Sequence, residues 1–340
     1  MSRKTSPICT ICIANYNGKD TIEPCLESVY GQEGDIPIEV IVHDDASTDD
    51  SVQFIRGRYS GVKLITSKKN VGFCTSNNLM AREAQGTYIL LLNNDAFLHR
   101  DALKRLYDFA ENLGRPAVLG LPQFDMSTRS LIDIGSLFDP FLNSVPNTNP
   151  ATGDVGMVSG ACLWMPRGLW NELGGFPDRF EYLAEDAFIC LKARLWGYPV
   201  IAVPRSGFDH WVGKNLGGGR MSQGRLTTTY ARRMYTESNK ISAMVICYPP
   251  PLLCAVLPAH LALLALEGLL LTLLKRDLSI WRNIYAKTFK TIWRRRAWLA
   301  EERNAAQGRR TAGLNDLCRV FTWFPYKLRM LLDHGLPSVG

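Results

Sequence analysis

Short apolar runs alternate with amphipathic stretches through the first 200 residues of the chain. The apolar runs have the length and the Val, Ile and Leu content of buried strands, at residues 8–14, 38–42, 62–66, 87–92 and 117–121. The stretches between them have apolar positions at helical spacing, at residues 21–30, 51–59, 75–84 and 101–113. This alternation predicts βαβ units and a mostly parallel central sheet that is covered by helices.

The second half of this region is less regular. Residues 127–153 are rich in Asn, Pro, Ser and Asp, and we expect irregular chain there. Residues 158–165 return to a strand pattern, and residues 185–196 have the pattern of a helix that ends at Gly197. Residues 213–224 hold five glycines, and this composition predicts a loop that can close over a bound ligand.

Residues 243–274 are the most apolar part of the chain. Prolines interrupt them, and the longest stretch without proline, residues 259–274, is shorter than the ~20 residues that a spanning helix needs. Residues 275–340 hold 14 Lys or Arg against 5 Asp or Glu, so a single crossing would place this basic tail against the positive-inside tendency. We expect a re-entrant or interfacial hairpin at the cytoplasmic membrane face. The alternative is a buried core helix of a soluble protein.

Charge and composition narrow the class of protein. The chain of 340 residues is 46% hydrophobic and 21% charged, which excludes a disordered or fibrous protein. The net charge of +7 is confined to the last fifth, so a nucleic-acid partner is disfavoured and an anionic membrane surface is favoured. Tryptophans interleave with the basic residues of this tail, as in interfacial helices, at positions 281, 293 and 298.

The cysteines indicate a reducing, cytoplasmic environment. Nine cysteines show no paired spacing, and we find no signal peptide pattern at the start. Cys9 and Cys12 lie three apart on a predicted strand, where they point to opposite faces, so we interpret them as structural. We expect two parts, a catalytic domain at residues 1–240 and a helical membrane-associated region at residues 241–340.

Polar clusters follow the first two predicted strands, at the sheet edge where parallel sheets bind ligands. Tyr16 and Asn17 follow the first strand; a tyrosine there can stack on a nucleotide base, or the segment can be an ordinary turn. Asp44 and Asp45 follow the second strand. One carboxylate there can accept the imide N–H of a pyrimidine, although this segment also suits a helix start.

Three later clusters carry further candidate chemistry. Asn94 and Asp95 follow a strand that ends in three leucines, and their oxygens suit a divalent cation or a loop cap. Glu185 and Asp186 stand at a helix start, where a carboxylate stays ionised and can act as a general base. His210 precedes the glycine-rich loop, which favours a metal or phosphate role over a structural one.

In this order and spacing, the clusters resemble the inverting glycosyltransferases of family 2, which have the GT-A nucleotide-sugar fold. The resemblance covers about residues 6–240, and no G-x-G-x-x-G follows the first strand, which disfavours a dinucleotide fold. The Asn-Asn-Asp form and the basic tail are most similar to the rhamnosyltransferase-like branch. The segments that carry the resemblance lie at residues 15–18, 42–49, 70–78, 93–95 and 174–186.

The resemblance implies a role for each matching position. Asp186 would be the catalytic base, and Asp95 and His210 would lie at a bound Mg²⁺ or Mn²⁺, although Asn93 and Asn94 replace an aspartate common in the family. The remaining matching or neighbouring residues would bind the nucleotide or the acceptor: Tyr16, Asn17, Asp45, Asn70, Gly72, Asn78, Asn94, Glu185, Trp211 and Arg220.

The implied reaction is transfer of a sugar, with inversion, from a UDP- or dTDP-sugar to a glycan or lipid-linked glycan hydroxyl, in cell-surface polysaccharide synthesis. dTDP-rhamnose is one candidate donor. Three alternatives stay open: a membrane-bound sensor or scaffold without catalysis, a nucleotidyltransferase, and a soluble glycosyltransferase whose tail joins two copies of the chain into a homo-oligomer.

Overall fold

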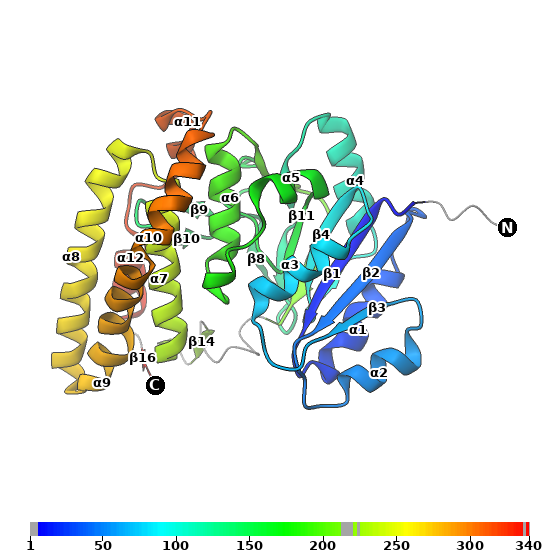
Figure 1. The fold of residues 1–340 in the computed structure, drawn as a ribbon, viewed down its shortest axis with the longest axis horizontal. Helices are drawn as coiled ribbons and strands as arrows, with labels where there is room; N and C mark the ends of the chain where they lie inside the picture. The colour runs from blue at the N-terminus through cyan, green and yellow to red at the C-terminus, as the bar shows by residue number, and fades with distance from the viewer. Residues whose placement is uncertain (1–5, 212–219, 223–224, 336–337, 340) are drawn as a thin grey trace. The chain divides into compact units, whose positions relative to one another are not determined.

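The computed structural model describes residues 6–211, 220–222, 225–335 and 338–339, and they belong to two compact units (Figure 1). The sheet unit takes in residues 1–136, 146–193 and 198–211. The helical unit takes in Leu137–Val145, Arg194–Gly197 and Val212–Gly340. The boundary expected from the sequence, between residues 240 and 241, falls inside the helix α7 (Tyr230–Cys247).

A mostly parallel seven-stranded sheet forms the centre of the sheet unit, as predicted. The strand order is β12-β6-β11-β4-β1-β2-β3, and only β11 runs antiparallel to its neighbours. The strands are β1 (Cys9–Asn15), β2 (Ile38–Asp44), β3 (Lys63–Thr66), β4 (Tyr88–Asn93), β6 (Val118–Gly120), β11 (Cys162–Pro166) and β12 (Val200–Ala202).

Helices cover this sheet because the connections between parallel strands cross over it. The apolar faces of α1 and α4 share one core with Ile11 and Ile13 of β1. The helix α3 packs on β1 and β2, and its buried Cys74 and Met80 lie outside that core, as expected for the other face. The helices of this unit are α1 (Lys19–Tyr30), α2 (Ser51–Arg58), α3 (Phe73–Glu83), α4 (Ala102–Leu113), α5 (Arg167–Leu173), η1 (Asp178–Phe180) and α6 (Glu185–Leu195), whose last two residues belong to the helical unit.

The expectation of irregular chain at residues 127–153 is wrong in part. Three short strands form there, β8 (Leu131–Asp133), β9 (Leu137–Phe138) and β10 (Ser144–Val145). The first joins a second sheet of order β5-β13-β7-β8 with β5 (Ala96–Leu98), β7 (Gln123–Asp125) and β13 (Phe208–His210). Strands of two or three residues are too short to show an alternating or continuous apolar pattern, so they cannot be predicted from the apolar positions.

The helical unit is built from α7 and the helices that follow it. These are α8 (Pro250–Lys275), α9 (Leu278–Ile280), the π-helical turn η2 (Trp281–Ala286), α10 (Lys287–Gly308), α11 (Leu314–Cys318) and α12 (Tyr326–His334). The hairpin of β9 and β10 also belongs to this unit, as do the short strands β14 (Arg220–Ser222), β15 (Arg225–Thr228) and β16 (Ser338–Val339).

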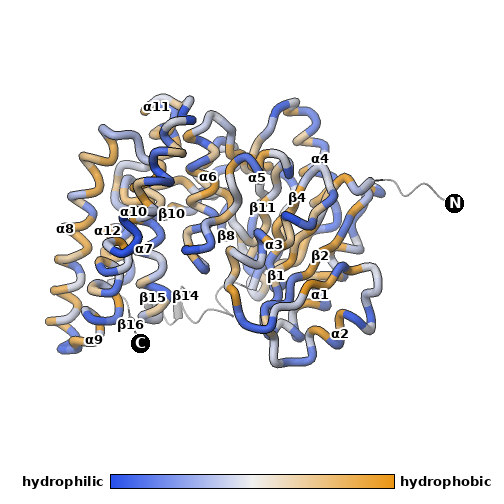
Figure 2. Tube along the Cα trace, viewed as in Figure 1, coloured by the Kyte–Doolittle hydropathy of each residue, from blue (hydrophilic) through white to orange (hydrophobic). Residues whose placement is uncertain are grey.

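The helix α8 is continuous, although the sequence predicted that prolines would interrupt it. Pro250 stands in the first turn, where the missing N–H would have no helical partner in any case. Pro258 lies inside the helix without ending it. Figure 2 shows α8 as an almost uniformly hydrophobic helix. Within the described residues it is the one helix long and apolar enough to cross a membrane, and 28% of its most apolar window is buried.

Candidate active site

The predicted polar clusters meet at one edge of the seven-stranded sheet. β1, β2 and β4 run parallel, and the register pairs Asn15 with Asp44 and Ala14 with Asn93. The segments that follow these strands therefore begin side by side. This is the carboxyl edge of the parallel strands, where open α/β sheets bind their ligands.

A chain of hydrogen bonds joins the three strand ends. The Asn94 amide donates to Asn15 Oδ1 at 2.8 Å, and Asn15 donates to Asp44 Oδ2 at 2.8 Å. Asp44 also accepts the backbone N–H and the hydroxyl of Ser47. Gly18 must be glycine here, because a Cβ would lie 2.1 Å from the Asn94 amide nitrogen. The polar residues at the end of β4 (Asn93, Asn94 and Asp95) are thus fixed against β1 and β2.

Asp45 holds the loop that carries Asn70 and Gly72. Its two carboxylate oxygens accept the N–H groups of Val71 at 2.6 Å and Gly72 at 2.9 Å. Asn70 Oδ1 accepts the same Gly72 N–H at 3.1 Å. Gly72 has φ +88°, a backbone conformation that favours glycine. The structure therefore brings together three residues that the sequence placed in two separate motifs.

Tyr16 and Asn17 form the turn after β1. Tyr16 is 50% exposed, so its side chain is accessible to a stacking partner. Asn17 has φ +48°, and its side-chain oxygen accepts the Thr48 N–H at 2.8 Å. Asn17 thus ties the turn after β1 to the segment after β2.

Asp95 and His210 are in direct contact. The His210 Nε2 lies 3.1 Å from Asp95 Oδ1; Asp95 is buried and His210 is partly buried. Gln123 Nε2 lies 3.1 Å from the other ring nitrogen, Nδ1. The Trp211 N–H donates to the Asp95 carbonyl at 3.1 Å, and its ring meets Phe97 edge to face at 5.6 Å. Two residues 115 positions apart are thus brought to one point by β5 and β13.

The residues at that point have the chemistry of a divalent-cation site. A carboxylate oxygen and an imidazole nitrogen, with an amide orienting the ring from behind, suit Mn²⁺ or Mg²⁺ when substrate oxygens complete the coordination. No group of three metal-ligating side chains occurs within the described residues. The protein therefore offers an incomplete shell that a diphosphate would have to fill.

Asp186 lies in the first turn of α6 and is partly buried. Its Oδ2 accepts the Gly160 N–H at 3.1 Å, and Oδ1 accepts the Ala187 N–H at 2.8 Å. Burial raises the pKa of Asp186, and these backbone N–H groups offset part of the rise. A carboxyl group with a raised pKa holds a proton more strongly, which is what a general base needs.

A short turn connects Asp186 with the segment that carries Asp95. Gly160, which binds Asp186, is followed by Ala161, whose carbonyl accepts the Asn93 N–H at 3.1 Å. Asn93 in turn precedes Asn94 and Asp95. The turn at residues 160–161 therefore bonds both to the predicted base and to Asn93, which lies two residues before the predicted metal ligand.

The segment before Asp186 has an unusual backbone. Glu181, Leu183 and Ala184 have φ of +60°, +71° and +64°, in the left-handed region that side chains other than glycine rarely adopt. Such conformations cost of order 1–3 kcal/mol each and gather at functional sites. Glu185, which follows, is buried.

Two other predicted residues have different surroundings. Asn78 is buried in α3, where its amide donates to the Phe176 carbonyl at 2.8 Å and accepts the Phe176 N–H at 3.0 Å. It fixes the loop before α6. Arg220 lies on β14 in the helical unit. Most of the glycine-rich loop, at residues 212–219 and 223–224, lies outside the described residues.

Sequence analysis missed three residues that position the site. Gln123 orients His210, Ser47 donates to Asp44, and Gly160 binds Asp186. A glutamine on a three-residue strand gives no pattern that marks it. Ser47 stands in the motif after β2, and that motif was the available signal for it.

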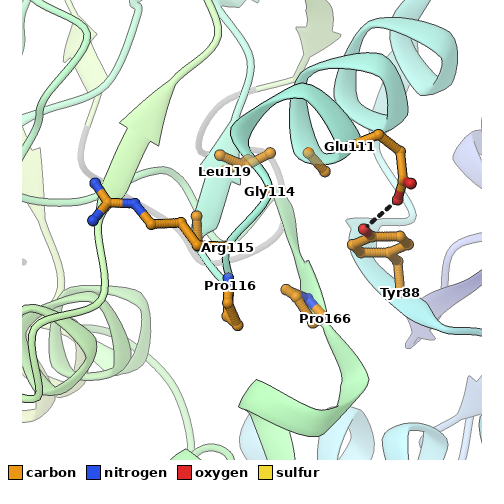
Figure 3. A pocket seen from close by; sticks show the side chains of 9 residues that line it. Tyr88, Glu111, Gly114, Arg115, Pro116, Leu119 and Pro166 are labelled. Atoms are coloured by element: carbon orange, nitrogen blue, oxygen red, sulfur yellow. Dashed lines mark hydrogen bonds between the residues drawn. The ribbon is translucent and has the colours of Figure 1, made fainter.

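A pocket in the sheet unit lies at the opposite ends of the strands from the candidate residues. Its volume is about 250 Å³, and Tyr88, Glu111 and Pro166 line it (Figure 3). Tyr88 begins β4 and donates its hydroxyl to Glu111 at 2.7 Å. The candidate residues lie at the opposite end of β4, so this pocket is separate from them.

Comparison with known proteins agrees with this arrangement. The model of "Glycosyl transferase family 2" matches residues 10–174. The matched residues, just under half of the chain, are similar to a family 2 glycosyltransferase domain and lie mostly in the sheet unit. The resemblance that the sequence motifs suggested is therefore confirmed, and so is the GT-A type of fold.

Relatives of this glycosyltransferase domain act on sugars according to their names. The N-acetylglucosaminyl-diphospho-decaprenol L-rhamnosyltransferase of Mycobacterium tuberculosis is 26% identical over 211 residues, which are 53% of this chain and 69% of that protein. The chain spans only 16% and 36% of the length of two other curated relatives.

Solved structures share the fold at low sequence identity. TarS 1–349 of S. aureus, solved with UDP-GlcNAc, has a TM-score of 0.55 at 18% identity and covers 88% of each chain. GalNAc-T7, solved with UDP, GalNAc and Mn²⁺, has a TM-score of 0.55 at 17% identity, over 72% of this chain and 48% of that one.

Proposed function

We propose that the chain is an inverting glycosyltransferase, which moves a sugar from a nucleotide-diphosphate donor to an acceptor hydroxyl. The observation that carries the proposal is the contact of Asp95 with His210; Asp95 lies in the segment that matches family 2, where the turn at residues 160–161 bonds to Asp186 and to Asn93. A metal-side carboxylate and a separate carboxylate are what a single displacement needs. One group faces the leaving diphosphate and the other takes the acceptor proton.

The nucleotide end of the donor would lie beside Tyr16 and Asp45. The exposed Tyr16 ring offers a stacking face for the base. Asp45 uses its oxygens to hold Val71 and Gly72, but a carboxylate has about four lone-pair positions, so it can still accept an imide N–H. This favours a uridine or thymidine donor over one without an imide.

The metal side of the site would be formed by Asp95 and His210. A bound Mg²⁺ or Mn²⁺ would neutralise negative charge on the leaving diphosphate. For His210 to offer the Nε2 lone pair, its proton must sit on Nδ1, and the Gln123 side chain must then present its oxygen to Nδ1. Gln123 therefore orients the ring, while Asp95 is the charged ligand.

Asp186 would deprotonate the acceptor hydroxyl. Its pKa is raised by burial, and two backbone N–H groups fix its direction. The acceptor oxygen then attacks the anomeric carbon from the face opposite the diphosphate. One bond forms, one breaks, and the configuration inverts. Glu185 lies next to the base and would contact the acceptor side.

For the substrates, we propose a glycan or lipid-linked glycan acceptor in cell-surface polysaccharide synthesis, with dTDP-rhamnose as a candidate donor. The name of the mycobacterial relative supports a lipid-linked acceptor. The apolar α8 and the basic tail support work at a membrane, on its cytoplasmic face, with residues 241–340 in contact with anionic lipid.

Nucleoside diphosphate release tests this function. The full chain in mild detergent with Mn²⁺ or Mg²⁺ is offered UDP-, dTDP- and GDP-sugars, alone and with membrane extract as acceptor source. Release of a diphosphate from one donor, lost in Asp186→Asn, supports the proposal. Nucleotide binding without release in both settings contradicts it and indicates a sensor. Release of pyrophosphate from a nucleoside triphosphate and a sugar phosphate would indicate a nucleotidyltransferase.

A further inference from the structure

The helix α8 exposes apolar side chains, which is the reverse of the pattern of a surface helix in a soluble protein. From Pro251 to Leu274 its exposed positions carry no polar side chain. The most exposed leucines are 48% to 72% accessible, and we call them the leucine face: Leu263, Leu266, Leu269, Leu270, Leu273 and Leu274. A helix on the surface of a soluble domain presents polar residues to water, so this face is built for a different medium.

The polar side chains of α8 point the other way, into the helical unit. Glu267 pairs with Arg233 of α7 and with Lys327 of α12, the latter at 3.1 Å. His260 is 4% exposed and lies 3.6 Å from Glu237 of α7. These contacts hold α8 against its neighbours along its length.

Close packing adds to this attachment. At Gly268, a Cβ would lie 2.6 Å from the Tyr285 ring and 2.9 Å from the Trp281 ring. α8 and η2 therefore approach each other more closely than any larger residue permits. The side of α8 that faces the protein is fixed both by ion pairs and by shape.

We infer that α8 lies in the plane of a membrane, with the leucine face in the acyl-chain boundary and with its charged side held by α7, η2 and α12. This inference rests on the proposed membrane association and adds the orientation of the helix. An in-plane helix of this kind buries its apolar face about 5–10 Å into the head-group region. The occupant of the leucine face is then an anionic bilayer.

Charge complementarity favours lipid over a second protein copy. Lys275 and Arg276 are exposed immediately after the leucine face, and Arg282 is exposed one turn beyond them. The exposed Trp293 ring lies 4.6 Å from the Arg296 guanidinium, a combination suited to the membrane interface. Basic residues around an apolar face attract phosphate head groups, whereas two such faces would repel each other.

The same contacts argue against a crossing orientation. A spanning α8 would carry its partners into the hydrocarbon, because Glu267 is paired with side chains of two other helices. Arg233, Glu237 and Lys327 would then leave water together with Glu267. In the in-plane orientation these groups stay on the protein side, and the exposed positions that meet the lipid are leucine, alanine, proline and Cys254.

Depth measurement along α8 tests the inference with the full-length protein. Ala255→Cys, Ala262→Cys and Leu273→Cys, three exposed positions on the same side of the helix, are each labelled with a spin label in a Cys254→Ser/Cys318→Ser background. The vesicles are phosphatidylglycerol–phosphatidylcholine. Positions 255 and 273 are about 27 Å apart along a helix axis. We expect nearly equal, shallow depths at all three positions; depths that differ by most of that length would show a crossing helix and overturn the inference.

Vesicle flotation separates this inference from the proposed function. Leu266→Gln/Leu270→Gln/Leu273→Gln is expected to weaken binding to the mixed vesicles by about tenfold or more, and the matched Leu314→Gln on α11 to leave it unchanged. Diphosphate release in detergent should persist in both variants. A wild-type chain that releases diphosphate but does not float, and that loses a dimer in the triple variant, would assign the face to a second copy instead.

Discussion

The two units both bury charged side chains, but they satisfy them in different ways. In the sheet unit, Asp45 and Asp186 are held by backbone N–H groups, which orient a carboxylate without neutralising it. In the helical unit, Glu237 is surrounded by Lys240, Lys327 and other cations. In the sheet unit, the carboxylates can therefore still accept hydrogen bonds from a substrate. In the helical unit, the carboxylate already uses its charge in ion pairs within the protein.

The pKa directions express the same difference. Burial raises the pKa of Asp186, and the backbone N–H groups that act against the rise do not outweigh it. Burial also acts to raise the pKa of Glu237, but Lys240 and Lys327 outweigh it and hold the pKa well below its usual range. A carboxylate held by backbone N–H groups therefore indicates a role in chemistry, whereas one surrounded by cations indicates a structural role.

The largest expected effect comes from Asp186→Asn. Loss of the base should lower kcat by about 10²- to 10⁴-fold with little change in nucleotide affinity. In the wild type, the raised pKa of Asp186 predicts that activity falls as pH falls through that pKa, because the base becomes protonated. Steady-state rates across pH, with nucleotide binding measured in parallel, check both statements.

Asp209→Asn is the matched control for this variant. Asp209 is also a mostly buried carboxylate in the sheet unit, but it pairs with Arg129 and lies 3.6 Å from His99. Its removal should leave kcat within a few-fold of wild type. Equal losses in both variants would mean that Asp186 contributes to folding rather than to proton transfer.

Removing Glu237 should have the largest effect on stability. Glu237→Gln leaves the buried Lys240 without its counter-ion, so we expect the free energy of unfolding to fall by about 3–5 kcal/mol. Because the folded pKa of Glu237 is depressed, its contribution is present above the unfolded pKa and is lost as pH falls through the folded pKa. Urea unfolding at neutral and acidic pH measures it.

An exposed pair provides the comparison for Glu237. Lys104 and Asp108 form an i,i+4 pair on α4 at 2.6 Å. Asp108→Asn should change stability by less than about 0.5 kcal/mol, because such pairs are well solvated. A Glu237→Gln variant as stable as this control would show that the cluster in the helical unit is not held by its charges.

Gln123→Leu should weaken binding of the metal ion without removing either of the proposed ligands. The change leaves His210 Nδ1 without its partner, and loss of a partner that orients a ligand typically costs 10–100-fold in metal affinity. We expect a rise of that order in the Mn²⁺ concentration for half-maximal thermal stabilisation or turnover. An unchanged Mn²⁺ dependence would remove His210 from the proposed metal site.

The sequence predicted the elements of the sheet unit better than its contacts. Long apolar runs such as β1 and β4 identified the strands, and the residues after them identified the edge. The contact of Asp95 with His210 could not be predicted from spacing, because it depends on β5 and β13, which have three residues each. Local pattern carries no information about which short strands pair.

In the helical unit the sequence was misleading for a physical reason. Prolines were expected to break residues 243–274, but Pro250 and Pro251 lie in the first turn of α8 and Pro258 is accommodated at an exposed position. Glu267 is a charged residue inside this apolar helix. Its partners, Arg233 and Lys327, come from helices far away in sequence, so only the fold shows that its charge is compensated.

The smallest expected effect concerns the backbone before Asp186. Ala184 has φ +64°, and its carbonyl accepts the Phe188 N–H at the start of α6. Ala184→Gly relieves the left-handed strain but gives the unfolded chain more freedom, so the net gain should be about 0.5–1 kcal/mol. Ala110→Gly, inside α4, should instead lose about 1 kcal/mol. If strain before the base helps to hold Asp186 in place, Ala184→Gly will have a higher free energy of unfolding and a lower kcat. The same gain in stability with an unchanged kcat would show that this strain has no part in catalysis.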